Sequence, residues 1–292
     1  MMKDLKISKS ILSISSPGTH LTPTDHSQGA KTTRSANEEL SAVCAAHPDY
    51  FRFFASLPLP SVSDSLKEID HALDNLGAVG FVVLSNANGV YLGDKMLDPV
   101  FAKLNARKAV VFMHPTTCNL IPAQISGNGI QAVKPLEQFP RPMMEFMFDE
   151  TRAVMNLLLS GTVAKYPHIT FIMSHCGCTL PALLDRVGGF ASLIGGPKNQ
   201  SDEFKNLLRE RFFFDLAGIP FPDQIHGLLR TLGRGGEQRL LYGSDYCFTP
   251  AKKVMDLLRA MDKGCEELFG VDGVKAVYSR NAAKLFGISA KL

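Results

Sequence analysis

The sequence has no hydrophobic run long enough to cross a membrane. Its longest unbroken apolar stretches span only a few residues, as in Ala109–Met113, whereas a transmembrane helix needs about 20. The start of the chain, Met1–Lys9, is polar and basic, and no apolar region of about 7 to 15 residues follows it, so no secretory signal is predicted. We therefore expect a protein that is neither inserted into a membrane nor exported.

Clusters of basic charge are also missing. The 31 lysines and arginines are spread along the chain and the formal net charge is only +3, so neither a nucleic-acid groove nor a membrane-binding patch is predicted. None of the six cysteines forms a C-x-x-C pair, and Cys176 and Cys178 are too close for a usual zinc pair or an easy disulfide. We expect free thiols in a reducing compartment, with the cytoplasm as the default.

What the sequence does contain is an alternation of strand and helix patterns. The seven predicted strands are Lys9–Ser15, Phe51–Leu57, Gly80–Leu84, Ala109–Met113, Thr170–Ser174, Phe212–Leu216 and Arg239–Tyr242. Such short, nearly continuous apolar runs are typical of strands buried on both faces of a parallel sheet. Between them, apolar residues recur at spacings of three and four, which predicts helices over Val62–Leu76, Asp149–Tyr166 and Ala251–Leu268. The alternation predicts an α/β architecture.

Length and strand number together favour a TIM-like (β/α)₈ barrel that lacks its first strand. The chain has 292 residues, and a barrel of this kind typically needs about 250. We predict a single domain over residues 1–292. A closed barrel has about eight strands, so either one strand escapes the pattern or it is absent from the chain. Two long loops are predicted after strands, where such barrels carry their active sites, over Thr19–Ala36 and Thr116–Arg141.

Three ionisable residues, His114, His175 and Asp245, come at or soon after the ends of three different predicted strands. These ends share one face of a parallel barrel, so we expect the three side chains to converge. Imidazole and carboxylate can bind a divalent metal, and a second histidine can hydrogen-bond a substrate oxygen or move a proton. The alternative for each residue is structural, because a histidine after an apolar strand is often a satisfied core or turn residue, and Asp245 could cap the next helix.

Other polar residues are weaker candidates. Asp215 ends a predicted strand and could face the same mouth, or it could cap a helix or pair with an arginine. Arg152 could bind a carboxylate, although an exposed helical arginine is the commoner interpretation. The remaining histidines are predicted to be solvated on the surface: His20, His26, His47, His71, His168 and His226.

Taken in order, seven segments resemble the amidohydrolase-related decarboxylases. They are Ser10–Gly18, His47–Pro60, Tyr91–Asp94, Val111–Thr116, Thr151–Gly161, Phe171–Gly177 and Leu241–Pro250. This family includes aminocarboxymuconate-semialdehyde, γ-resorcylate and fungal 6-methylsalicylate decarboxylases, and the first two segments are most similar to the last group. The resemblance implies a metal-dependent hydrolase-type barrel.

The resemblance also implies one divalent metal ion, with zinc first and manganese or magnesium as alternatives. It makes His114 and Asp245 metal ligands, and it makes His175 a residue that contacts the substrate or the metal-bound water. Two further ligands in the family come from a His-x-His or Glu-x-His motif on the first strand, and no such motif lies before Ser10. We therefore expect that strand to be absent, which leaves two of four protein ligands. A homodimer is implied as well.

The activity that the resemblance implies is metal-assisted, non-oxidative decarboxylation of a hydroxylated aromatic carboxylic acid, such as 6-methylsalicylate, in polyketide metabolism. Asp245 would deliver a proton to the ring carbon that bears the carboxylate, and His175 would hydrogen-bond the substrate. A wall for the ring could come from loop residues, some of which could instead be plain core: Phe139, Met143, Met144, Phe146 and Phe148. Two alternatives stay open, a metal-dependent hydrolase of an ester, lactone or amide, and a catalytically inactive shortened relative.

Overall fold

The computed structural model describes residues 2–22, 24–119 and 138–288. Its internal contacts divide the chain into two compact units. The first unit is Lys9–Phe171, and the second unit is Ile172–Leu292 together with Met1–Ser8. A single domain over residues 1–292 therefore stays a prediction. In the described part of the chain, no helix is both long and apolar enough to cross a membrane.

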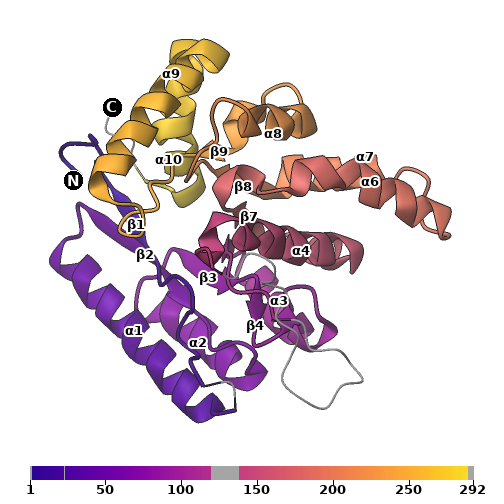
Figure 1. Ribbon diagram of the computed structural model, residues 1–292. Coiled ribbons are helices and arrows are strands. Elements are labelled where there is room, and N and C mark those ends of the chain that lie inside the picture. The colour runs from indigo at the N-terminus through magenta and orange to yellow at the C-terminus, as the bar shows by residue number, and fades with distance from the viewer. Residues whose placement is uncertain (1, 23, 120–137, 289–292) are drawn as a thin grey trace. The chain divides into compact units, whose positions relative to one another are not determined.

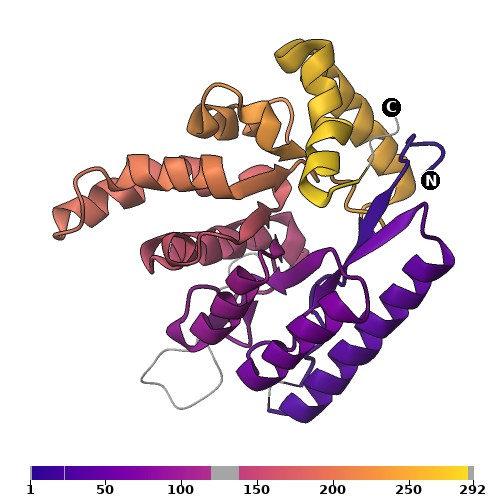
Figure 2. The same cartoon turned by 180° about the vertical axis from the view of Figure 1, so that it is seen from behind.

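Parallel strands form the centre of the first unit. In spatial order they are β1 (Ser10–Leu12), β2 (Phe51–Ser56), β3 (Gly80–Leu84) and β6 (Val110–His114). The helices are α1 (His26–Ala46), α2 (Val62–Asp74), α3 (Asp98–Ala106), α4 (Glu145–Leu159) and α5 (Thr162–Lys165), with short turns η1 (Lys95–Leu97) and η2 (Arg141–Met143). A small hairpin of β4 (Asn86–Ala87) and β5 (Val90–Tyr91) follows β3. Figures 1 and 2 show α1 and α2 lying along the strands β1 to β3.

The strands of the first unit form because their apolar side chains are buried. Phe53, Phe81 and Met113 are at most 1% exposed, and complete burial of such a side chain stabilises the fold by about 1.5–3 kcal/mol. In the pairing of β3 with β6, Leu84 lies opposite His114. This register brings the segment after β3 next to the segment after β6.

Helix α1 shows that part of the loop prediction over Thr19–Ala36 is wrong, because the helix begins at His26. Asp25 caps the helix by accepting a hydrogen bond from the Gln28 amide at 2.9 Å. The buried face of α1 consists of small or polar residues, namely Gly29, Thr33 and Asn37. A helix whose buried face is not apolar produces no hydrophobic periodicity, so its sequence resembles a loop.

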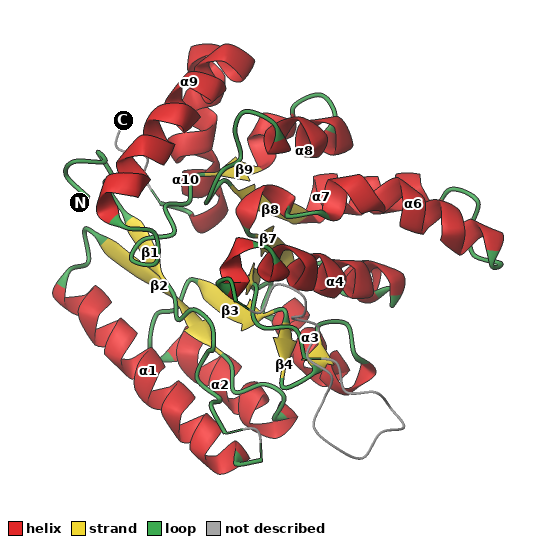
Figure 3. Ribbon diagram, viewed as in Figure 1, coloured by secondary structure: helices red, strands yellow, loops and turns green. Residues whose placement is uncertain are grey.

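The second unit contains the last two strands and most of the C-terminal helices. Strand β7 (Thr170–Met173) begins in the first unit and ends in the second, and β8 (Phe212–Asp215) pairs in parallel with β9 (Leu240–Leu241). The helices are α6 (Leu180–Leu193), α7 (Gln200–Arg211), α8 (Gln224–Leu232), α9 (Ala251–Lys275) and α10 (Asn281–Phe286). The short helical segments are η3 (His175–Gly177), η4 (Gly236–Arg239) and η5 (Ala276–Arg280). Figure 3 shows α10 packed beside β9.

All seven predicted strands are present, with shorter bounds at several ends. The helix predicted over Val62–Leu76 is confirmed as α2. The helix predicted over Asp149–Tyr166 is divided into α4 and α5 at Gly161, which has a φ of +74° that a continuous helix excludes. The last predicted helix continues beyond Leu268 to Lys275. The six cysteines, all within the described residues, are free thiols as expected.

Candidate active site

His114 is the last residue of β6, and its ring is held from two sides. Nδ1 lies 2.7 Å from the carbonyl oxygen of Pro115, so we assign the ring proton to Nδ1. Nε2 then accepts from the hydroxyl of Ser15, at 3.3 Å. Phe112 and Phe146 approach the ring edge-on, with centroids 6.3 and 6.5 Å away. A neutral imidazole anchored through Nδ1–H to a backbone carbonyl is the form in which histidine binds metals.

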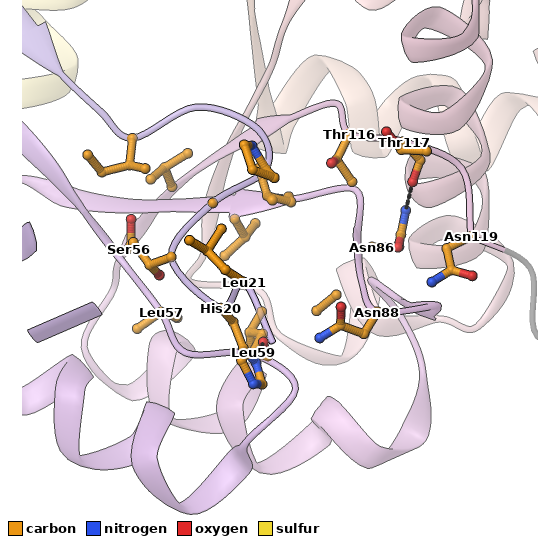
Figure 4. Close-up of a pocket in the computed structure, with 18 of the residues that line it drawn as sticks. His20, Leu21, Ser56, Leu57, Leu59, Asn86, Asn88, Thr116, Thr117 and Asn119 are labelled. Atoms are coloured by element: carbon orange, nitrogen blue, oxygen red, sulfur yellow. Dashed lines mark hydrogen bonds between the residues drawn. The ribbon is translucent and has the colours of Figure 1, made fainter. Parts of the chain in front are cut away.

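A cavity of about 350 Å³ opens beside this histidine in the first unit (Figure 4). It is formed by the segments that follow β1, β2, β3 and β6. Thr116 and Thr117, which come soon after His114, both line it, and the hydroxyls of Ser16 and Thr116 lie 2.7 Å apart. Figure 4 shows leucines on one side of the cavity and asparagines and threonines on the other. A mixed lining of this kind is typical of small-molecule sites.

Asp149 of α4 is a fully buried carboxylate at the centre of a polar network in the same unit. One of its oxygens accepts from the Asn86 amide at 3.0 Å and from the Ser85 hydroxyl. The other oxygen accepts from the Tyr91 hydroxyl and, at 2.9 Å, from the Arg152 guanidinium. Burial and the neighbouring carboxylate raise the pKa of Tyr91, so its phenol stays protonated and acts as a donor.

This network continues to the wall of the cavity. The Ser85 hydroxyl accepts from the backbone N–H of Thr116 at 3.1 Å, and the Asn86 amide donates to the Thr117 carbonyl at 3.0 Å. The two residues that follow Pro115 are therefore fixed through groups that Asp149 binds. The network thus supports both the cavity and the segment next to His114.

In the second unit, the turn after β7 places His175 against Asp215. The backbone N–H groups of His175 and Ala217 donate to the same oxygen of Asp215, at 3.1 and 2.9 Å. The side-chain amide of Gln224 donates to the His175 carbonyl at 2.8 Å. His175 and Cys176 have φ values of +50° and +55°, a conformation that costs a non-glycine residue roughly 1–2 kcal/mol. Strain held by hydrogen bonds in this way is common at functional sites.

Asp215 is a buried carboxyl whose pKa is shifted by its surroundings. Burial raises the pKa of the Asp215 carboxyl, the nearby His175 and the two backbone N–H groups oppose that rise, and the charge of Asp245 adds to it. Gly243 leaves room for this carboxyl, since a Cβ at that position would stand 3.2 Å from Asp215 Cγ. Of the three predicted site residues, His175 is therefore the one that Asp215 contacts directly.

Asp245 lies in the loop between β9 and α9, with a φ of +52°. Its carbonyl accepts from the Thr249 N–H at 2.8 Å, and its carboxylate accepts from the Thr249 hydroxyl at 3.3 Å. The N-cap of α9 is Pro250, so the alternative interpretation of Asp245 as the cap of that helix is wrong. The convergence of His114 with His175 and Asp245 stays a prediction, because His114 belongs to the other unit.

The structure differs from several other predictions made from the sequence. Arg152 is only partly exposed and binds a carboxylate, because it donates to the buried Asp149 and lies 3.2 Å from Cys118 Sγ. His20 is half-buried rather than solvated, with Nδ1 2.9 Å from the Leu59 carbonyl oxygen. Among the proposed wall residues, Phe146 contacts His114, whereas three others are more than 40% exposed: Phe139, Met143 and Phe148. Part of the loop predicted over Thr116–Arg141 lies outside the described residues.

Comparison with known proteins establishes the family. Residues 13–288 match the Amidohydro_2 family of amidohydrolases. The 6-methylsalicylic acid decarboxylase of Penicillium expansum is 32% identical over 256 residues, which cover 87% of this chain and 74% of that protein. The chain therefore belongs to the amidohydrolase family.

Two solved structures show the same fold. A protein described as amidohydrolase II superposes with a TM-score of 0.84 at 30% identity, over 98% of this chain and 86% of the other. A dihydroxybenzoic acid decarboxylase from Polaromonas sp. JS666, solved with manganese and 2-nitroresorcinol, gives a TM-score of 0.79 at 21% identity, over 98% and 83% of the two chains. The α/β fold of the amidohydrolase barrels is thereby confirmed for this chain.

Proposed function

We propose that this protein is a carboxy-lyase that removes the carboxylate of a hydroxylated aromatic acid such as 6-methylsalicylate. The observation that carries the proposal is the likeness, over 87% of the chain, to the decarboxylase of Penicillium expansum. The geometry supports it in two places. His114 lies next to a partly apolar cavity, and the buried carboxyl of Asp215 binds the backbone N–H of His175.

In this reaction the bond between the ring carbon and the carboxylate carbon breaks. Carbon dioxide leaves, the electron pair of the broken bond stays on the ring carbon, and a proton replaces the lost group. We assign delivery of that proton to Asp245, and we assign a hydrogen bond to a substrate oxygen to His175. Asp215 is a positioning residue, because it binds the backbone N–H of His175 at 3.1 Å.

His114 and Asp245 are the proposed ligands of one divalent ion. The Nδ1–H of His114 is engaged by a backbone carbonyl, which makes Nε2 the nitrogen that would coordinate the ion in place of its hydrogen bond to the Ser15 hydroxyl. No group of three or more His, Cys, Asp or Glu side chains gathers around a metal position among the described residues. Imidazole and carboxylate donors suit zinc, and manganese is the alternative. When bound, the ion supplies Lewis-acid polarisation of the substrate's carboxylate and neighbouring phenolic oxygen.

We further propose a cytoplasmic homodimer that takes part in polyketide metabolism. The six free thiols support a reducing compartment. Size-exclusion chromatography with light scattering tests the dimer, and a monomer at micromolar concentration would contradict it.

The activity is tested by incubating the protein with 6-methylsalicylate and added zinc or manganese and measuring 3-methylphenol by chromatography. His114→Ala and Asp245→Asn should each reduce the rate by a factor of about 100 or more, since each removes a proposed metal ligand. The matched controls are His168→Ala and Asp256→Asn, which alter exposed side chains of the same types. Equal rates in the site variants and the controls would overturn the assignment of residues.

Hydrolysis of an ester, lactone or amide is the second candidate function, and the match to an amidohydrolase family favours it. In that reaction Asp245 would activate a water molecule instead of protonating a ring carbon. Aryl lactones and aryl acids tested side by side with the same metal separate the two functions. Turnover of the lactones alone would replace the first proposal with the second.

A further inference from the structure

Three residues that line the cavity in the first unit place it close to His114. Leu84, the register partner of His114 in β3, lines the cavity. Thr116 lines it from the segment after His114, and Ile14 lines it from the residue before Ser15, whose hydroxyl binds His114. A ligand held at His114 therefore meets this cavity at one of its edges.

The lining of the cavity is divided by polarity, as Figure 4 shows. Leu21, Leu57 and Leu59 form an apolar side. Leu57 and Leu59 are each 7% exposed, so they are fixed in the core, whereas Leu21 is 62% exposed. Leu21 thus has apolar surface that a ligand would remove from water, which favours binding of an apolar group on this side.

The opposite side carries two amides for which the described part of the chain offers no hydrogen-bond partner. Among the described residues, nothing binds the side chains of Asn88 and Asn119, both of which line the cavity. By contrast, Asn86 is fully used, since it donates to Thr117 and Asp149 and accepts from the Gly89 N–H. Half-buried amides that are not needed by the fold are available to a polar group of a ligand.

The size of the cavity limits what it can hold. Its volume of about 350 Å³ lies near the lower end of the range for small-molecule sites, which is roughly 300–1,000 Å³. One aromatic ring with its substituents suits this space. Arg141, which donates to the Thr117 hydroxyl at 2.7 Å, places a positive charge at the polar side and favours an anionic ligand.

We propose that this cavity is the specificity pocket for the substituted edge of the ring, an inference that rests on the proposed function. An alkyl substituent contacts Leu21, Leu57 and Leu59, and a second ring hydroxyl, where the acid carries one away from its carboxylate, binds Asn88 and Asn119. Alkyl-substituted hydroxybenzoates are then preferred over unsubstituted ones. Burial of one methyl group corresponds to a preference of about fourfold in affinity.

The test is calorimetric titration of the whole chain with 6-methylsalicylate and with salicylate, in the presence of manganese. The unchanged protein should bind the methylated acid about fourfold more tightly. Leu21→Asn should lower that ratio, because it removes exposed apolar surface while leaving the core, with Leu57 and Leu59, intact. Leu159→Asn is the matched control, since Leu159 is 53% exposed and lies outside the cavity, and it should keep the ratio.

A second variant tests the polar side. Asn88 has a φ of +52°, so Asn88→Gly removes the amide without straining the backbone. The variant should lose the extra affinity for 2,4-dihydroxy-6-methylbenzoate over 6-methylsalicylate that the unchanged protein shows. Because each result is a ratio between two ligands on the same protein, a general loss of stability does not alter it.

The outcomes separate this inference from the proposed function. Decarboxylation of both acids with equal affinities would overturn the specificity pocket and leave the function standing. Preferential binding of the methylated acid without turnover would overturn the function and support the pocket. Binding of neither acid, or an unchanged ratio in Leu21→Asn, would overturn the pocket.

Discussion

Replacing Asp149 by asparagine should be among the most destabilising conservative changes in the first unit. The carboxylate is fully buried and accepts hydrogen bonds from Ser85, Asn86, Tyr91 and Arg152. Asparagine keeps the shape but places an NH₂ group where one oxygen accepts two bonds. It also removes the negative charge that neutralises the guanidinium.

The magnitude follows from these contacts. A hydrogen bond to a charged group is worth about 1.5–3 kcal/mol, and loss of one partner of a buried ion pair costs about 3–5 kcal/mol. The Arg152 side chain is 39% exposed, so water compensates part of the loss and we expect about 3 kcal/mol. That is a large part of the 5–15 kcal/mol that stabilises a typical protein.

The assay is urea unfolding at pH 7, followed by circular dichroism, and the midpoint should fall by about 1 M or more. Asp98→Asn is the matched control, because Asp98 forms an exposed ion pair with Lys165 at 2.6 Å, and such pairs contribute less than about 1 kcal/mol. If the two variants lost equal stability, the buried network would not have the role assigned to it.

Two further predictions concern the backbone and pH. In urea unfolding, Gly93→Ala should destabilise the first unit by about 1–3 kcal/mol more than Gly77→Ala. Both glycines have a positive φ, but only at Gly93 would a Cβ stand 3.0 Å from the backbone of Asn156. Equal losses of stability in the two variants would contradict this clash. Burial raises the pKa of the Cys265 thiol to about 12, whereas a thiol in the unfolded chain titrates at about 8.5. The contribution of this thiol to stability is therefore complete below a pH of about 8.5 and is lost as the pH rises toward 12. The free energy of unfolding should therefore fall between pH 9 and 10 by up to about 1.4 kcal/mol more in the unchanged protein than in Cys265→Ala, and parallel pH profiles would refute this.

The strands could be predicted from the sequence because burial on both faces of a parallel sheet leaves a continuous apolar run. The runs containing Phe81 and Phe212 show this, since both side chains are fully buried. Helix α1 could not be predicted in full, because it buries Thr33 and Asn37 instead of an apolar stripe. Asn37 binds the Ser56 carbonyl at 3.0 Å, and such a contact depends on tertiary structure.

The candidate site residues were predicted from polar side chains at or soon after the ends of strands, and their roles stay predictions. That position indicated His114, His175 and Asp245, and it indicated Asp215 more weakly, although Asp215 is buried and binds the backbone N–H of His175. The network of Asp149 escaped prediction, because its partners in the segment after β3 lie 58 to 64 residues away in the chain. The sequence did contain one signal for this network, because Asp149 is a carboxylate in the first half of helix α4 and the helix turns that follow it are buried.

The central claim is that the chain replaces a ring carboxylate by a proton. The most direct measurement is turnover of 6-methylsalicylate with manganese in deuterated water, followed by mass spectrometry and NMR of the product. We expect carbon dioxide and 3-methylphenol with one deuterium, on the ring carbon between the hydroxyl and methyl groups. Recovery of unchanged acid with every divalent metal added, or a product that retains its carboxylate, would contradict it.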